Sequence, residues 1–401
     1  MTSQAGDTGT AVASAAPGRC DEPVVGMVGA GQLARMTCQA AIGLGVRFRV
    51  LAADAGESAA LVCAGTQLGD YRSGSDLMEF AAGCDVVTFD HEHVPGAQLD
   101  ALERAGVVIR PGARALRLTQ DKRAMREWLT ERGIACPPFA AVASTGGIAS
   151  FAAAHGWPVV LKAVSGGYDG RGVWVCSTAR EAADVLAQAG SRGLELIAEQ
   201  HVAFTRELAA LVARSPAGQG AAYPVAATVQ RDGICHEVLA PAPGLPAGRQ
   251  AEAQRLALAI AAELGVTGLM AVELFDTADG LLVNELAMRP HNSGHWTMDG
   301  SVTSQFEQHL RAVLDLPLGA PGLAGRSAVM VNVLGGDDPD LHDRLIHVMA
   351  ADPGVKVHLY GKVVRPGRKV GHVTVVGDDI ARLRDRARRA ASYLSHGTEE
   401  P

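Results

Sequence analysis

The sequence predicts an α/β protein that begins with a doubly wound parallel sheet and continues with α+β parts and a small β-rich module. Three observations indicate this. Apolar strand-like runs alternate with helical segments over about the first hundred residues, the pattern becomes antiparallel after residue 205, and short apolar runs return after residue 325. Alternating strands and helices favour a parallel sheet, since each parallel connection has to cross the sheet.

The composition excludes several classes of protein. A chain of 401 residues is too long for one ordinary core, so we expect two or three domains. The net charge of −7 argues against a nucleic-acid partner, and no stretch is apolar and long enough for a membrane span. Seven cysteines without a C-x-x-C pair indicate neither a disulfide framework nor a cysteine zinc site. Residues 1–21 lack the pattern of a signal peptide, so we expect a disordered leader and a cytoplasmic location.

The expected elements follow from the apolar runs. In the first part we expect strands at residues 23–28, 47–51, 85–89 and 107–109, with a helix from the turn at 29–34 to about residue 43. Glycine-rich residues 144–147 and two prolines at 137–138 bracket a smaller unit with strands at 158–162, 172–176 and 194–199. Later strands are expected at 208–212, 223–229 and in a hairpin over 269–286, after a helix at about 251–264. A Gly- and Pro-rich loop at 317–325 precedes strands at 328–334, 356–359 and 371–376 and a helix near 379–394.

The turn from Gly29 to Ala34 has the G-x-G-x-x-A spacing of a dinucleotide fingerprint, and Asp54 ends the next expected strand. Glycines there permit close backbone approach, and a helix N-terminus favours an anion. The same turn is common in sheets that bind no dinucleotide, so both interpretations stay open. Gln32, at the helix start, is in a position to orient a substrate instead.

Lys162 ends an expected strand and is followed by a loop with glycines at 166, 167, 170 and 172. A lysine charge beside flexible backbone N–H groups suits a polyphosphate, although the loop is not a Walker motif. The alternative is a β-hairpin with a glycine turn. Tyr168, Asp169 and Arg171 favour a ligand-binding loop, since a turn alone does not need these three side chains.

Glu273 and Glu285 flank the Ala278-Asp-Gly280 turn of the expected hairpin. A three-residue loop with Gly280 in a left-handed conformation places these two glutamates opposite each other on one face. Two carboxylates so close repel each other unless a cation lies between them, and Mg²⁺ prefers such hard oxygen ligands. An even loop length would put the two side chains on opposite faces. Asn284 lies beside them and is a further candidate ligand.

Three polar clusters carry competing interpretations. Glu199 and Glu207 follow an apolar strand, where carboxylates suit ribose hydroxyls or an adenine amine, but an exposed acidic turn explains them equally well. The pairs His91/His93 and His291/His295 suggest zinc, yet Pro and Gly around the second pair disfavour a zinc-binding helix, and Arg, His and Asn clustered there suit a small anion better. The basic run over residues 362–372 is either a solvated hairpin or a phosphate-binding segment.

Together these residues resemble the ATP-grasp superfamily and, within it, the N5-carboxyaminoimidazole ribonucleotide synthetase family of bacterial and fungal purine synthesis. The resemblance extends from about residue 24 to residue 376 and lies in GAGQL at 29–33, LTQDK at 118–122, GGYDGRG at 166–172, EQ at 199–200, NELA at 284–287, RPHNSGH at 289–295 and RPGRKVGH at 365–372. It implies an ATP-grasp fold with a pre-ATP-grasp, Rossmann-like domain (22–120), a lid subdomain (121–204), a catalytic subdomain (205–320) and a C-terminal β-rich module (321–396).

The resemblance also implies the reaction. Bicarbonate attacks the γ-phosphate of ATP to give carboxyphosphate, and the amine of 5-aminoimidazole ribonucleotide captures it or the CO₂ that it releases. The implied cofactors are ATP and Mg²⁺, with Mn²⁺ as a substitute, and the metal ligands are Glu273 and Glu285. The residues implied to bind ATP are Arg117, Lys162, Gly167, Tyr168, Asp169, Gly170, Arg171, Gly172, Val173, Glu199, Gln200, His201, Val202, Glu207, Gln230, Asn284 and Glu285.

The remaining implied roles concern the reacting centre and the second substrate. The residues implied to act at the reacting centre are Tyr168, Asp169, Arg171, Arg289, His291, Asn292 and His295. Those implied to bind 5-aminoimidazole ribonucleotide are Gln32, Leu33, Glu92, Lys362, Arg368 and Lys369. Members of the family typically form homodimers, so we expect one here.

One segment departs from the family pattern. The family has an acidic residue near Ala227 and often a histidine at the position of Gln230. Gln230 retains hydrogen-bonding capacity, whereas Ala227 cannot replace a carboxylate. The alternatives are another ATP-grasp ligase such as formate-dependent glycinamide ribonucleotide transformylase, a nicotinamide-dependent oxidoreductase built on the Gly29 turn, and a nucleotide sensor without turnover.

Overall fold

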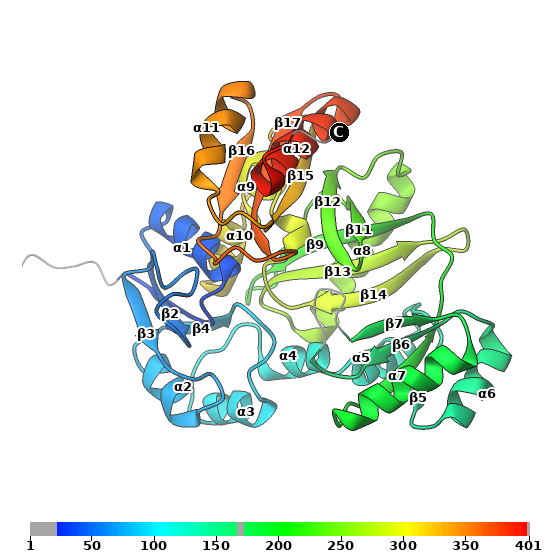
Figure 1. Ribbon diagram of the computed structural model, residues 1–401. Helices are drawn as coiled ribbons and strands as arrows, with labels where there is room; N and C mark the ends of the chain where they lie inside the picture. Colours follow the sequence, from blue (N-terminus) through cyan, green and yellow to red (C-terminus); the bar gives the residue numbers. More distant parts are fainter. Residues whose placement is uncertain (1–21, 167–171, 399–401) are drawn as a thin grey trace, which may run out of the picture.

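Three β-sheets organise the protein in the computed structural model, which describes residues 22–166 and 172–398 (Figure 1). The first sheet is parallel, with the order β3-β2-β1-β4. Its strands are β1 (Val24–Val28), β2 (Arg47–Ala52), β3 (Gly65–Leu68) and β4 (Val86–Phe89), and its helices are α1 (Gln32–Gly43), α2 (Gly74–Ala81) and α3 (Gly96–Arg104). Helix α1 packs with Val25 and Met27 on one face, whereas α2 and α3 pack with Val28 on the other. The doubly wound parallel sheet is therefore confirmed.

One expected strand is wrong. The strand expected at residues 107–109 is a single bridge between Ile109 and Val87, and Pro111 has no N–H with which to continue the ladder. The glycine-rich residues 144–147 lie at the start of a helix. The Ser144 side chain accepts a hydrogen bond from the Gly147 N–H at 3.1 Å and caps a helix that begins at residue 145.

A four-stranded antiparallel sheet with the order β5-β8-β6-β7 follows two connecting helices. The elements are α4 (Ala113–Gln120), α5 (Lys122–Glu131), β5 (Phe139–Val142), α6 (Thr145–His155), β6 (Val159–Ala163), β7 (Val173–Cys176), α7 (Ala179–Ser191) and β8 (Leu196–Gln200). Ile148 and Phe151 of α6 pack on Leu161 of β6, so this unit has a small core of its own. We call it the lid sheet.

The third sheet has nine strands in the order β14-β13-β9-β11-β12-β15-β17-β16, with β10 paired to β9. Its elements up to residue 313 are β9 (Arg206–Arg214), β10 (Gly220–Ala222), β11 (Ala226–Arg231), β12 (Ile234–Ala240), α8 (Ala247–Leu264), β13 (Gly268–Asp276), β14 (Leu281–Ala287), a 3-10 turn (Asn292–Gly294), α9 (Thr297–Gly300) and α10 (Gln305–Val313). We call it the central sheet.

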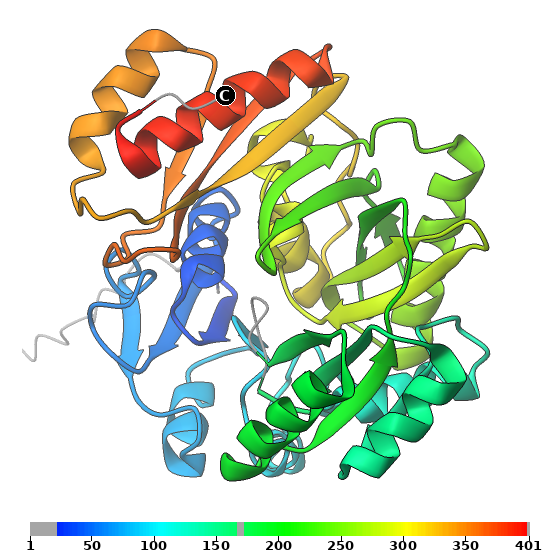
Figure 2. The same ribbon diagram turned by 45° about the vertical axis from the view of Figure 1, so that its right-hand side comes forward.

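The C-terminal strands extend the central sheet, since β15 pairs with β12. These elements are β15 (Ser327–Leu334), α11 (His342–Ala351), β16 (Lys356–Leu359), β17 (Lys369–Gly377) and α12 (Ile380–His396). Figure 2 shows α12 lying across the C-terminal strands. The helices within the described ranges are all too short or too polar to cross a membrane.

The β13–β14 hairpin brings the two expected metal ligands together by a route that the sequence did not predict. Asp276 pairs with Leu281, so the connection has four residues, not three. An even connection alone would offset the register, but a β-bulge between Glu273 and Leu274 on one strand and at Asn284 on the other shifts it back. Glu273 and Glu285 are therefore register partners, as expected.

Candidate active site

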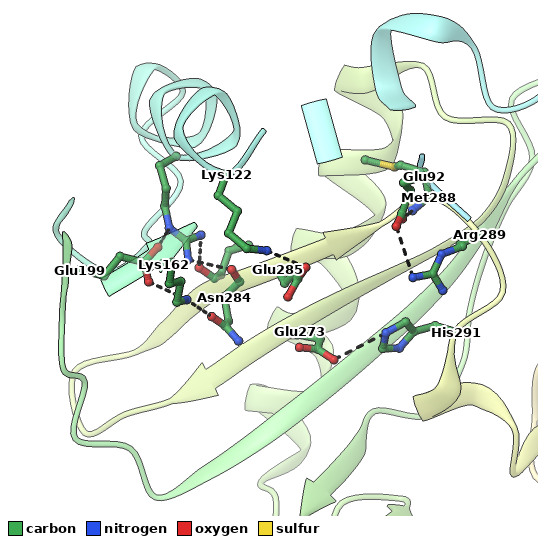
Figure 3. A network of polar contacts seen from close by, with 12 residues as sticks. Glu92, Lys122, Lys162, Glu199, Glu273, Asn284, Glu285, Met288, Arg289 and His291 are labelled. Carbon is green, nitrogen blue, oxygen red and sulfur yellow. Dashed lines mark hydrogen bonds and ion pairs between the residues drawn. The ribbon is translucent and has the colours of Figure 1, made fainter. Parts of the chain in front are cut away.

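Two glutamates on the β13–β14 hairpin form the acidic centre of the site (Figure 3). Their side chains keep 27% and 47% of their surface exposed, at Glu273 and Glu285 respectively. Burial, and then the charges of Glu285 and Glu207, raise the pKa of Glu273 to about 8. A pair of carboxyl groups in which one resists ionisation is chemically suited to a cation, because a divalent ion removes the repulsion between the two carboxylates.

Cations and a histidine surround this pair. Lys122 Nζ lies 3.0 Å from Glu285 Oε1, and His291 Nε2 lies 3.7 Å from Glu273 Oε1. Burial alone would raise the pKa of Glu285, but the Lys122 ammonium outweighs it and lowers the pKa. The two glutamates are thus inequivalent: Glu285 is held as a carboxylate, whereas Glu273 is not.

A buried ionic network joins the lid sheet to the central sheet. Lys162 Nζ lies 2.7 Å from Glu199 Oε2 and donates to Asn284 Oδ1 at 3.2 Å. Arg126 of α5 donates from Nε to Glu199 Oε1 at 2.7 Å and from its terminal nitrogens to the carbonyls of Val283 and Asn284. Glu199 is only 2% exposed; burial opposes its ionisation, yet Lys162 and Arg126 lower its pKa.

The first domain reaches the site through the segment after β4. Arg289 NH2 lies 3.3 Å from Glu92 Oε2, and Glu92 Oε1 accepts from the Met288 N–H at 3.1 Å (Figure 3). Gln32 accepts a hydrogen bond from Lys362 Nζ. The residues expected to bind the aminoimidazole substrate from the two ends of the chain are therefore in contact.

Asp90 occupies the glycine turn that resembles a dinucleotide fingerprint. Its carboxylate accepts from the N–H groups of Gly31 and Ala34. A Cβ at Gly31 would lie 2.5 Å from Asp90 Oδ2, and one at Gly29 would lie 2.9 Å from Asp90 Cβ. These glycines accommodate a side chain of the protein itself, which removes the physical reason for a dinucleotide there.

The zinc alternatives receive no support from the described residues. Across residues 22–166 and 172–398, no group of three or more His, Cys, Asp or Glu side chains is arranged to hold a metal ion. The rings of His91 and His93 stack with centroids 5.3 Å apart, and burial lowers the pKa of His91 to about 4. These histidines pack as an aromatic pair.

Two expected contact residues are buried. His295 is 0% exposed, its Nδ1 lies 3.0 Å from Gln305 Nε2, and its Nε2 is buried without a hydrogen-bond partner among the described residues. Gln305 also accepts from the His291 N–H at 2.9 Å. Leu33 is 5% exposed and packs with Phe306, which leaves its backbone as the part that can meet a ligand.

Other expected residues lie around this centre. Gln230 hydrogen-bonds Glu207, and burial raises the pKa of Glu207. Ala227 is 8% exposed and packs in the central core, so nothing polar replaces the expected carboxylate. Arg117, on α4, forms an ion pair with Asp100 on the surface.

The glycine loop and the C-terminal basic run complete the expected set. Gly167, Tyr168, Asp169, Gly170 and Arg171 lie outside the described residues. Gly172 accepts a hydrogen bond from the Ala163 N–H at 2.8 Å, and Val173 begins β7. Gln200 ends β8, and His201 and Val202 follow it. Arg368 donates to the Val363 carbonyl, Lys369 begins β17, and Asn292 opens the turn after His291.

Sequence reasoning missed two residues of the network, Lys122 and Arg126. Lys122 lies in the LTQDK stretch, and Arg126 is one helical turn further along α5. The i, i+4 spacing of two cations at a helix start was the available signal. This spacing identifies site residues only once α5 is known to pack against β14, where Arg126 donates to the strand's carbonyls.

The comparisons with known proteins agree with one another. The ribonucleotide synthetase preATP-grasp domain family matches residues 23–120, the ATP-grasp domain family residues 127–306, and the phosphoribosylaminoimidazole carboxylase C-terminal domain family residues 328–386. The chain is 54% identical over 379 residues to N5-carboxyaminoimidazole ribonucleotide synthase of Mycobacterium tuberculosis, which covers 94% of this chain and 88% of that protein.

Two solved structures are similar along nearly the whole chain. One is N5-carboxyaminoimidazole ribonucleotide synthetase from Thermus thermophilus, with a TM-score of 0.84, 36% identity, and coverage of 93% of this chain and 98% of that chain. The other is N5-carboxyaminoimidazole synthase from Aspergillus clavatus in complex with ADP and 5-aminoimidazole ribonucleotide, with a TM-score of 0.86, 31% identity, and coverage of 93% and 99%.

Proposed function

Because this chain belongs to the N5-carboxyaminoimidazole ribonucleotide synthase family of ATP-grasp enzymes, we propose that Glu273 and Glu285 bind the magnesium ion of its nucleotide. The protein is an ATP-dependent carbon–nitrogen ligase of purine biosynthesis, which joins bicarbonate to 5-aminoimidazole ribonucleotide and releases ADP and phosphate. The observation that carries the metal assignment is the close carboxylate pair, in which burial and like charges raise the pKa of Glu273 to about 8. Magnesium would supply charge stabilisation to the phosphates there.

The network around Lys162 supports a role in holding the nucleotide. Lys162 is fixed by Glu199 and Asn284, so its ammonium is oriented before any ligand arrives. An ammonium held in this way suits phosphate oxygens, and a preorganised charge stabilises a transferring phosphoryl group without reorganisation. In this proposal Glu199 positions Lys162, and Gln200, at the end of β8, binds the base and sugar together with His201 and Val202, which follow it.

The segment after β14 suits the inorganic substrate. In the reaction, a bicarbonate oxygen forms a bond to the γ-phosphorus as the bond to ADP breaks, giving carboxyphosphate. The exocyclic amine then attacks the carboxyl carbon, phosphate leaves, and the amine loses a proton. Arg289, tied to Glu92, and His291, close to Glu273, present a positive charge and an imidazole beside the metal ligands. We assign these two residues to bicarbonate and carboxyphosphate.

The aminoimidazole ribonucleotide fits between the first domain and the basic run. Gln32 and Lys362 are hydrogen-bonded to each other, and Lys369 begins the nearby strand β17. The two lysines and Arg368 supply charge for a ribonucleotide phosphate. His295 keeps a positioning role, since Gln305 connects it to the backbone of His291.

Phosphate release from ATP provides the test. We expect release to require bicarbonate and 5-aminoimidazole ribonucleotide together, and not formate. Glu285→Gln should abolish turnover through loss of metal charge. Turnover close to that of the wild type in Glu285→Gln would refute the metal assignment while leaving the ligase activity in place.

Four finer points stay predictions. Manganese should replace magnesium, because the same oxygen ligands suit it. The family resemblance predicts a homodimer, which light scattering on the purified protein would test. A cytoplasmic location and the five domain bounds given above are also predictions.

A further inference from the structure

Tyr360 is a buried tyrosine at the junction between the C-terminal strands and the first domain. It follows the last residue of β16, and only 1% of its surface is exposed. Its N–H donates to the Val370 carbonyl at 2.9 Å, and its own carbonyl accepts from the Ser58 hydroxyl of the first domain. The backbone is therefore fixed from both sides, just before the basic run over residues 362–372 begins.

The ring of Tyr360 is fixed as firmly as its backbone. Leu33 and Met36 of α1 and Phe306 of α10 pack with it in one apolar cluster. The hydroxyl lies 2.8 Å from Nδ1 of His372, on β17. A buried aromatic ring whose hydroxyl is engaged has little freedom to turn, so it offers a rigid surface to a neighbouring side chain.

The ammonium group of Lys362 lies over this ring. Its Nζ is 5.7 Å from the ring centroid, and it donates to Gln32 Oε1. Between the two residues, Gly361 has a left-handed φ of 66°, which turns the chain sharply and brings the Lys362 side chain back over Tyr360. A cation within about 6 Å of an aromatic face is attracted by the electrons of the ring. The ring and Gln32 therefore hold the ammonium group from two parts of the chain, the C-terminal strands and α1.

We infer that Tyr360 is a positioning residue for 5-aminoimidazole ribonucleotide. The inference rests on the proposed function, which assigns Lys362 to the phosphate of this substrate. A free lysine side chain loses much conformational entropy when a ligand orders it. Because Tyr360 orders Lys362 beforehand, the phosphate meets a cation that is already in place.

Tyr360 acts through Lys362 and not by touching the substrate, since almost none of its surface is accessible. The phosphate lies at the opposite end of the ribonucleotide from the amine that reacts. Weaker placement of Lys362 should therefore raise the KM for the ribonucleotide and leave kcat nearly unchanged.

Leucine and phenylalanine substitutions separate the ring of Tyr360 from its hydroxyl. Tyr360→Leu removes the aromatic face and should raise the KM for 5-aminoimidazole ribonucleotide about three- to tenfold, the range expected for loss of a cation–π contact. The KM for ATP should stay close to that of the wild type. Tyr360→Phe keeps the aromatic face and should restore most of the affinity for the ribonucleotide. An unchanged KM in Tyr360→Leu, or a KM in Tyr360→Phe as high as in Tyr360→Leu, would overturn the inference.

Tyr223 provides the matched control for a loss of stability. It is also fully buried, its hydroxyl donates to the Thr303 carbonyl at 3.0 Å, and its ring lies edge-on to Trp296 in the central sheet. Tyr223→Leu should lower the free energy of unfolding yet leave the KM for the ribonucleotide unchanged, because a smaller folded fraction lowers the apparent kcat and not the KM. If Tyr223→Leu and Tyr360→Leu raise this KM by the same factor, the effect of Tyr360 is only structural and the inference fails.

A double-mutant cycle with Lys362→Met tests the connection between the two residues. Lys362→Met alone should raise the KM for 5-aminoimidazole ribonucleotide about tenfold or more, the usual effect of losing a charged hydrogen bond. In that background Tyr360→Leu should raise the KM little further, because the ring then has no ammonium group to hold. Full additivity of the two changes would overturn the inference and leave the phosphate role of Lys362 in place. An unchanged KM in Lys362→Met would instead refute that role, and the inference would fall with it.

Discussion

The two glutamates of the proposed metal site should have opposite effects on the stability of the protein without ligand. Glu273→Gln removes a carboxyl group that the fold holds against ionisation. Glu285→Gln removes a carboxylate that Lys122 stabilises at 3.0 Å. We therefore expect Glu273→Gln to stabilise the ligand-free protein and Glu285→Gln to destabilise it, while both variants lose magnesium-dependent turnover.

The magnitude follows from the pKa of Glu273, which burial and its acidic neighbours raise from 4.5 to about 8. In the unfolded chain the Glu273 carboxyl ionises above pH 4.5, whereas in the folded protein it stays protonated up to about pH 8. Below pH 4.5 the group is protonated in both states and costs no stability, and between pH 4.5 and 8 the free energy of unfolding falls as the pH rises. At pH 7 the loss is at most about 3 kcal/mol, and at pH 5 it is below about 1 kcal/mol. For Glu285, about half exposed, the ion pair with Lys122 is worth about 1 kcal/mol or less.

Urea unfolding of the metal-free protein at pH 5 and pH 7.5 provides the measurement. The gain in free energy of unfolding for Glu273→Gln over the wild type should grow between the two pH values. The reasoning fails if Glu273→Gln destabilises the protein as much as Glu285→Gln does, or if its effect is the same at both pH values.

Three further predictions concern other parts of the site. Arg126→Met should cost about 3 kcal/mol in the free energy of unfolding, because it leaves the buried Glu199 with only one partner. Arg123→Met on the same helix should change the free energy of unfolding little, since its ion pair with Glu127 is exposed. Urea titration of both variants checks this, and similar losses would contradict it. Lys369→Ala should raise the KM for 5-aminoimidazole ribonucleotide with a smaller effect on kcat, and steady-state kinetics showing an unchanged KM would exclude a phosphate role. Burial lowers the pKa of His309 to about 3, so below pH 6.5 the unfolded chain binds a proton at this histidine and the folded protein does not. The free energy of unfolding should therefore fall by up to about 1.4 kcal/mol per pH unit below pH 6.5. In the same denaturation assay, His309→Gln should show a shallower dependence of stability on pH.

The sequence predicted the partnership of Glu273 and Glu285, although the expected loop length was wrong. Residues alternating along two strands specify a face, and glycine at a turn indicates where the strands reverse. The β-bulge at Asn284 could not be predicted from the sequence, since a residue of any type can be the extra residue of a bulge. The correct pairing thus arose from two deviations that compensate each other, and only the register of the folded hairpin reveals them.

Other parts of the site depend on packing between segments distant in the chain. Arg126 is an ordinary helix residue until α5 lies against the lid sheet and β14. His295 belongs to a polar motif, yet Gln305 and Phe306 cover it. Sequence periodicity indicates which residues can share a face, but it does not indicate which face a later helix will cover.

The hydrogen bonds of Lys162 bear on how a nucleotide arrives. An ammonium group has three donors, and within the described residues Glu199 and Asn284 engage two of them. In the proposed nucleotide-binding role, the third N–H, which no other described residue engages, donates to a phosphate oxygen. A nucleotide that binds Lys162 as proposed can therefore do so without first breaking the bonds that connect the lid sheet to the central sheet.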